Sequence, residues 1–374
     1  MAFAASLPVH PRASTAVLLA WFVAVLARAV QERRWPRMGF ARAIWVGPVG
    51  FYALHVLGLV ASSDGAAGWF ALEVKLGMVA VPLLGGWEWS RLQEPDRARA
   101  GRALVAAFGW GLAARFAWSL LRQTAAAMET GGLEFTYAAL SHPFHPSYLA
   151  LYFTVWWLFV RPAAAASAAA GVAIGLLQSR AGLLVAGCAA VLAAGSRARR
   201  VAAAVLVAGM VFGIACAGAL GRLRLEAAPA AAGTGSTGGR LQAWTAAWEV
   251  LRDSPLGVGT GDVVPELVER YEAAGAEYAR VRRMNAHSTY LQTGVALGLP
   301  GLAALLYWWG SVAAYAWRRR RVVAVAAIAA IALHGMVEAL LELQQGVVFV
   351  AFVLTWGAVA VGYERVAEAA SEPE

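Results

Sequence analysis

The sequence predicts an all-α, polytopic integral membrane protein with about 11–12 transmembrane helices and one large outer loop that contains amphipathic helices. Of its 374 residues, 60% are hydrophobic and only 14% are charged. Apolar stretches of roughly 17 to 25 residues recur along the chain, the length that a hydrocarbon layer about 30 Å thick requires. Backbone amides in lipid must be satisfied within their own segment, so we expect every span to be a helix.

Eleven apolar runs are expected to cross the membrane. They cover about residues 14–30, 43–61, 67–86, 102–121, 146–160, 162–178, 181–195, 200–220, 289–317, 322–340 and 346–363. The first run is long and lacks a clear cleavage site, which favours a retained helix over a signal peptide. The sixth to eighth runs are rich in Ala and Gly, which favours close helix packing. The longest run, from Thr289, is where we expect an additional break, and with it a twelfth helix.

Arginine-rich short loops alternate with loops that carry almost no positive charge, so the basic loops are predicted to be cytoplasmic. The outer face then holds residues 122–146, the turn at Ser179–Arg180 and the long loop 221–288. This orientation divides the chain into four parts. They are an N-terminal bundle of about eight helices (1–220), the outer loop with the site (221–288), C-terminal helices (289–363) and a cytoplasmic tail (364–374). The net charge of +9 is a topology signal, and no nucleic-acid partner is expected.

The outer loop is predicted to contain two helical stretches joined by a tight bend. In "GRLQAWTAAWEVLRDSPLG" four apolar residues recur at helical spacing, which predicts an amphipathic helix near the membrane surface. These residues are Leu241, Trp244, Trp248 and Leu251. The bend "SPLGVGTGD" has glycines at alternate positions, but no strand precedes it, so a dinucleotide site is disfavoured. The second stretch leads into the cluster Arg282, Arg283, Asn285 and His287.

Three stretches carry a resemblance to a known family: "LLQSRAGLL" with Arg180, "GRLQAWTAAWEVLRDSPLGVGTGD" with Arg240, and "NAHSTYLQTGVALGLPG" with His287. In order and topology the chain resembles the O-antigen ligase and polymerase superfamily from about residue 70 onward. The resemblance implies a glycosyltransferase of the bacterial inner membrane with its active site facing the periplasm. It implies an undecaprenyl-diphosphate-linked glycan as donor, lipid A core or another glycan as acceptor, and membrane lipids as surroundings.

The residue types suit that chemistry. A diphosphate leaving group builds negative charge, and planar guanidinium groups hold phosphate oxygens in a bidentate way. Arg180 and Arg240 are the expected clamp, with Arg283 and Arg282 as helpers. No metal or cofactor is expected, because the outer loops lack carboxylates at convincing ligand spacing. The alternative for each arginine is an interfacial anchor whose charge lies at the lipid headgroups.

His287 is the candidate general base, because an imidazole can accept the proton of an attacking sugar hydroxyl near neutral pH. Attack opposite the departing diphosphate would invert the anomeric carbon. Asn285 or Tyr290 could orient the ring or the sugar. The alternative for His287 is a structural one, in which it bonds the free amides at the start of its helix.

Other polar residues lie where they need a partner. His142 and His145 in "SHPFHPSY" are either turn residues or substrate contacts. Four residues, Glu73, Lys75, His334 and Glu338, fall within predicted spans, where charge usually marks a site or a bundle contact. Glu338 is expected either to face the sugar acceptor or to pair with a neighbouring helix.

The branch of the family is left open by the residues. A single dominant outer loop favours a ligase, with an O-antigen or exopolysaccharide polymerase and a protein O-oligosaccharyltransferase as alternatives. A transporter would carry its unusual polar residues near the bilayer midplane, whereas here they gather at the outer surface. A scaffold without chemistry would have no need for Arg180, Arg240 and His287 to converge.

Overall fold

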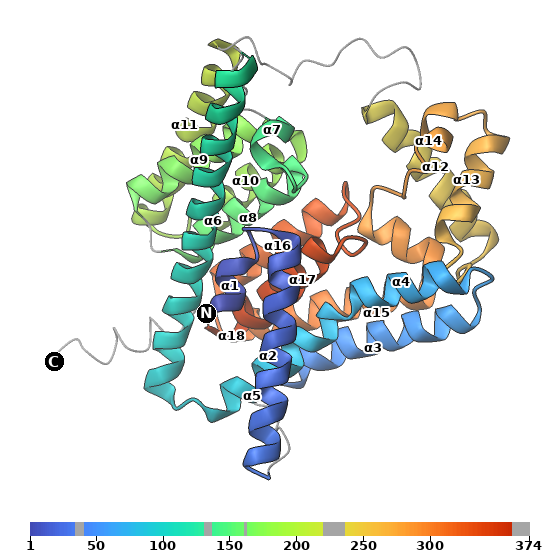
Figure 1. Ribbon diagram of the computed structural model, residues 1–374, viewed down its shortest axis with the longest axis horizontal. Helices are drawn as coiled ribbons and strands as arrows, with labels where there is room; N and C mark the ends of the chain where they lie inside the picture. The colour runs from blue at the N-terminus through green and yellow to red at the C-terminus, as the bar shows by residue number, and fades with distance from the viewer. Residues whose placement is uncertain (34–40, 131–136, 161–162, 220–235, 361–374) are drawn as a thin grey trace.

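The computed structural model describes residues 1–33, 41–130, 137–160, 163–219 and 236–360, and in them the chain is helical throughout. The N-terminal helices are α1 (Ala2–Ser6), α2 (Pro11–Gln31), α3 (Arg42–Val60), α4 (Gly65–Lys75), α5 (Gly77–Arg91), α6 (Glu94–Thr130), α7 (Tyr137–Ser141), α8 (Pro146–Phe159), α9 (Ala164–Leu177), α10 (Arg180–Ala193) and α11 (Arg197–Ala219). The remaining helices are α12 (Ser236–Asp253), α13 (Val263–Ala273), α14 (Glu277–Val281), α15 (Thr289–Arg318), α16 (Val322–Gly335), α17 (Gln344–Phe352), the π-helix η1 (Val353–Gly357) and α18 (Ala358–Ala360). Figure 1 shows α9, α10 and α11 beside α6 on one side and α12, α13 and α14 on the other.

The predicted fold class is confirmed: the chain is an all-helical, multi-pass membrane protein. Among the described residues, six helices are long and apolar enough to cross a bilayer, and four further apolar helices are shorter. The exact number of crossings stays a prediction. The calls on residues 220–235 and on the tail 364–374 lie outside the described residues.

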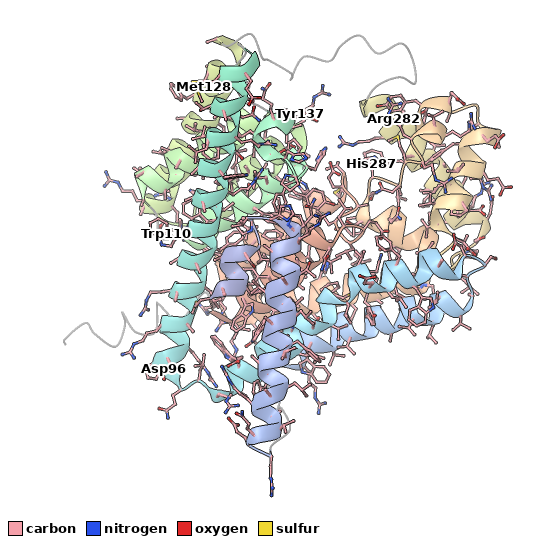
Figure 2. All side chains as sticks on the ribbon, in the orientation of Figure 1. Asp96, Trp110, Met128, Tyr137, Arg282 and His287 are labelled. Atoms are coloured by element: carbon pink, nitrogen blue, oxygen red, sulfur yellow. The ribbon has the colours of Figure 1, made fainter. Side chains whose placement is uncertain are left out.

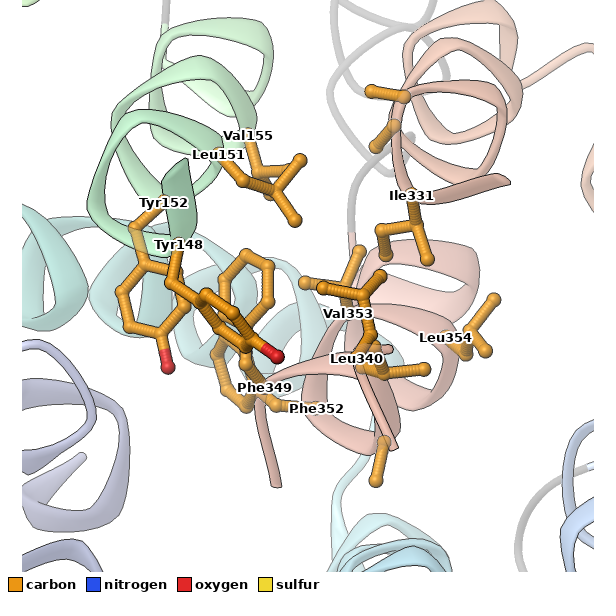
Figure 3. Close-up of a cluster of buried hydrophobic side chains, with 14 of the residues drawn as sticks. Tyr148, Leu151, Tyr152, Val155, Ile331, Leu340, Phe349, Phe352, Val353 and Leu354 are labelled. Atoms are coloured by element: carbon orange, nitrogen blue, oxygen red, sulfur yellow. The ribbon is translucent and has the colours of Figure 1, made fainter. Parts of the chain in front are cut away.

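The core is formed where α8 packs against α16, α17 and η1. Figure 3 shows aromatic and aliphatic side chains of α8 directed at those of the C-terminal helices. Tyr152 stacks on Phe349 with ring centroids 3.9 Å apart, and its hydroxyl donates to the Gln345 carbonyl at 2.8 Å. This dense packing holds α8 in place, and the site forms at the first turn of this helix.

The Gly-rich pair α9 and α11 packs as closely as its composition predicts. A Cβ atom placed on Gly171 would lie 2.2 Å from the Leu206 carbonyl oxygen, and one on Gly175 only 2.4 Å from that of Met210. Without side chains at these positions the two backbones touch, which is the usual way for apolar helices to gain contact in lipid.

The predicted break in the longest run is confirmed at Gly298, whose φ of 63° and ψ of −155° only glycine adopts readily. The carbonyls of Val295 and Ala296 accept from the amides of Val258 and Gly259 at 2.9 and 3.0 Å. The glycine-rich bend that was expected after α12 therefore completes the hydrogen bonding of the kink. It ties the outer loop to α15.

The predicted run 67–86 falls within one candidate span, Gly65–Arg91, in which a turn at Leu76 divides α4 from α5. Two other predicted boundaries were wrong. The second helical stretch of the loop is divided between α13 and α14 by Gly275, which has a φ of 64°. The run expected to reach residue 340 ends as α16 at Gly335. Glu338 consequently lies in the connection between α16 and α17, where Thr289 holds its carbonyl.

Candidate active site

Glu338 is the centre of a polar cluster that joins three helix starts. Its side chain is only 7% exposed, and its Oε1 accepts from Arg240 Nη2 of α12 at 2.8 Å. The Ser147 hydroxyl in the first turn of α8 donates to the same oxygen at 3.2 Å. The Glu338 carbonyl accepts from both the amide and the hydroxyl of Thr289, which begins α15. One residue thus connects α8, α12 and α15.

His287 lies directly before α15 in a turn that is held on several sides. Its amide donates to Asn285 Oδ1 at 2.9 Å, and Trp244 Nε1 of α12 donates to its carbonyl at 3.4 Å. Its φ of 44° is uncommon for a residue with a bulky side chain, so the turn holds a strained conformation. Figure 2 shows His287 on the side of the α12–α15 region that faces α7.

The His287 ring points its Nδ1 toward the carboxylate without bonding to it. Nδ1 lies 3.9 Å from Glu338 Oε2 and has no hydrogen-bond partner among the described residues. That separation is too long for a hydrogen bond but short enough for a charge interaction. The arrangement favours a proton on Nδ1, which leaves Nε2 to accept one.

His145 caps the start of α8 on the other side of the same carboxylate. Its Nδ1 accepts from the Ser147 amide at 3.4 Å, lies 2.7 Å from the Ser147 hydroxyl, and is 4.0 Å from Glu338 Oε1. The single hydroxyl proton of Ser147 can go to His145 or to Glu338, but not to both. A change in the charge of His145 or of Glu338 would therefore change which of the two accepts the Ser147 hydrogen bond.

Burial lowers the pKa of His287 from its ordinary value, and it is the largest cause. Glu338 acts in the opposite direction, while Arg240 and His145 lower the pKa further. Burial likewise lowers the pKa of His145, again against the effect of Glu338. Both imidazoles are therefore neutral at pH 7, as a base must be before it accepts a proton.

The other predicted residues lie around this cluster at different distances from it. Arg180 is exposed at the first position of α10, whose start packs on that of α8, since a Cβ on Gly182 would lie 2.4 Å from the Ala150 Cβ. Arg282 and Arg283 are exposed, and Arg282 lies over the Tyr278 ring at 4.0 Å.

Two candidates are held by the protein itself. The Tyr290 hydroxyl donates to the Ala332 carbonyl at 3.0 Å, which joins α15 to α16. Asn285 supports the backbone of the His287 turn. Of the charged residues near the predicted spans, Lys75 pairs with Glu342 at 2.8 Å, and Glu338 pairs with Arg240.

Residues 165–306 match the family model described as O-antigen ligase. Over this segment the chain is similar to the O-antigen ligase and polymerase superfamily. Its members are glycosyltransferase-like ligases and polymerases of the membrane. A search of curated proteins found no match for the chain.

The O-antigen ligase match includes Arg180, Arg240 and His287, but it ends before Glu338 and begins after His145. In the structure Glu338 contacts Arg240 and lies near both His287 and His145. Glu338 and His145 are therefore candidate site residues outside the matched segment. Sequence reasoning missed Ser147, Trp244 and Thr289. The only signal for Ser147 was its place two residues after His145 at a helix start, where capping side chains are common.

Proposed function

We propose that the chain is an O-antigen ligase-type glycosyltransferase. It transfers a glycan from undecaprenyl diphosphate to a hydroxyl of lipid A core on the periplasmic side of the bacterial inner membrane. The observation that carries the proposal is that Arg240 and His287 come from opposite ends of the outer loop and meet at one buried carboxylate, Glu338. The family match supports a ligase or polymerase type of reaction.

Arg240 would bind the diphosphate of the donor. In the structure its guanidinium is paired with Glu338, and its Nε is buried without a partner among the described residues. A diphosphate offers the same fork of oxygens as a carboxylate and carries more charge, so it would replace Glu338 at this position. Arg180 at the start of α10 would add a second guanidinium and the positive end of a helix.

His287 would act as the general base in a single displacement. The acceptor oxygen forms a bond to the anomeric carbon, its proton passes to His287 Nε2, and the bond to the diphosphate oxygen breaks. The electron pair stays on the diphosphate, whose growing charge the arginines stabilise. The imidazolium that forms is stabilised by Glu338, whose carboxylate lies 3.9 Å from Nδ1. Because no protein–sugar bond forms, the single displacement inverts the anomeric configuration. The arginines would supply the positive charge for the leaving group, so the proposed reaction needs no metal.

The same residues would serve a polymerase or a protein O-oligosaccharyltransferase, which differ in the acceptor. We favour the ligase because the single outer loop, residues 221–288, supplies both Arg240 and His287. A polysaccharide transporter is a weaker alternative, since it would use neither a base nor a leaving-group clamp.

The experiment that tests the function is a transfer assay with the purified chain in liposomes, a polyprenyl-diphosphate glycan, and a chelator. Lipid A core, a glycan repeat and a serine-containing peptide are supplied as separate acceptors. We expect glycosylated lipid A core with inverted anomeric configuration. Product on another acceptor would assign the chain to that branch. Carrier movement without any new glycosidic bond would refute the proposal in favour of transport.

A further inference from the structure

A second group of cationic side chains lies on α6, and none of its members belongs to the Glu338 cluster. Arg115, Ser119 and Arg122 follow one another at three- and four-residue spacing, so they share one face of the helix. That face is fixed to the end of α7: the Ser119 hydroxyl donates to the Leu140 carbonyl at 2.7 Å, and Arg122 donates to the Ala139 carbonyl. We call Arg115 and Arg122 the α6 arginine pair.

Arg115 is buried, and no carboxylate of the described residues pairs with it. It is only 3% exposed, and its Nε and Nη2 have no hydrogen-bond partner among the described residues. Its nearest described interaction is with the Phe144 ring, 6.0 Å from the guanidinium carbon. A guanidinium enclosed without an anion is destabilising, because the charge has lost its hydration. Such a group usually marks a functional site in a membrane protein.

The site is closed on one side and open on the other. Toward α1 the site is closed by close helix packing. One turn before Arg115, the backbone of α6 lies so near α1 that a Cβ on Gly111 would be only 2.1 Å from the Ala5 carbonyl oxygen. Toward the end of α6, Arg122 lies 3.3 Å from Nδ1 of the exposed His142, and its own Nε has no partner among the described residues. A ligand would therefore enter past His142.

We propose that the α6 arginine pair is a second anion site that binds the phosphate group of a lipid. Two guanidinium groups, with three nitrogens still unpartnered, can both engage the tetrahedral oxygens of one phosphate. Phe144, whose ring lies beside Arg115, directly precedes His145 of the Glu338 cluster in the chain. A lipid bound at the α6 arginine pair would therefore lie next to the reaction centre. The phosphate belongs either to the acceptor lipid or to a membrane phospholipid. Only the acceptor assignment rests on the proposed function.

The test uses the full chain in detergent and native mass spectrometry. Phosphatidic acid is compared with diacylglycerol, which has the same chains but no phosphate. We expect bound phosphatidic acid to exceed bound diacylglycerol at least tenfold, and Arg115→Gln and Arg122→Gln each to remove most of that excess. The matched control is Arg252→Gln on the outer loop, where Arg252 is 66% exposed, and it should bind as wild type does. Equal binding of the two lipids, or wild-type binding by Arg115→Gln, would overturn the proposal.

Competition then names the source of the phosphate. Displacement by lipid A but not by dephosphorylated lipid A or phosphatidylglycerol supports the acceptor, and equal displacement by phosphatidylglycerol supports a membrane lipid. No donor and no transfer enter this assay, so its failure leaves the proposed function untouched.

Thermal unfolding gives a readout that a structural role would not produce. In lipid-free detergent, Arg115→Met should raise the Tm by several degrees, because it removes an uncompensated charge. It should also abolish the rise in Tm that phosphatidic acid causes in the wild type. A lower Tm for Arg115→Met without lipid would contradict the proposal, since the protein would then already satisfy that charge.

Discussion

The sites around Arg240 and Arg115 differ in whether a described side chain of the protein supplies the anion. Arg240 is paired with the buried carboxylate of Glu338 at 2.8 Å, whereas Arg115 is buried beside Phe144 with no carboxylate in contact among the described residues. A ligand that binds Arg240 must replace the Glu338 carboxylate, whereas a ligand that binds Arg115 displaces no carboxylate of the described residues. Arg240 is therefore suited to an anion that arrives and leaves with each turnover. Arg115 is suited to one that stays longer.

The largest expected effect is on transfer by Arg240→Gln. The change removes the proposed diphosphate clamp and leaves Glu338 buried without its cation, so we expect turnover to fall about a hundredfold or more. The transfer assay in liposomes measures it, with Arg252→Gln as the control that should stay within twofold. If turnover fell only about tenfold or less, Arg240 would serve mainly to hold Glu338.

The same Arg→Met change should have opposite effects on stability at the two sites. Arg240→Met leaves a buried carboxylate unpaired, which typically costs about 3 kcal/mol or more and lowers the Tm. Arg115→Met should raise it. Thermal unfolding of both variants in one lipid-free detergent measures the two Tm shifts, and shifts of the same sign would show that the two arginines do not differ in this way.

The pH dependence of kcat/KM should move when Glu338 changes. His287 acts as a base only when neutral, so the rate falls as the pH drops through its pKa, which burial places below the ordinary value. Glu338 raises that pKa and Arg240 lowers it. Glu338→Gln should therefore move the acid limb to lower pH, and Arg240→Gln should move it higher. An acid limb that is the same in all three proteins would exclude His287 as the titrating base.

The smallest effect is expected at Tyr290, which sequence reasoning offered as a substrate contact. Its hydroxyl is used between α15 and α16, so Tyr290→Phe should destabilise the protein by about 1 kcal/mol and leave transfer within about twofold. Unfolding and transfer are measured on the same preparation. A tenfold loss of transfer with unchanged stability would return Tyr290 to the substrate site.

The sequence predicted the helical class, a break in the long run from Thr289, and several charged members of the cluster, because apolar length and rare charge near apolar spans leave strong local signals. It could not predict that Glu338 is the meeting point. Glu338 was expected in a helix, and its position depends on Thr289, nearly fifty residues away, and on Arg240 from the outer loop. It also gave no warning of Arg115, since one arginine in an apolar run reveals nothing about whether a carboxylate faces it.

Donor binding by Arg240 and proton transfer by His287 can be separated by measuring donor affinity and turnover in His287→Ala and Arg240→Gln. We expect His287→Ala to keep the donor Kd within about threefold of wild type while turnover falls at least about a hundredfold. We expect Arg240→Gln to weaken donor binding at least about tenfold. Wild-type turnover by His287→Ala would contradict proton transfer by His287.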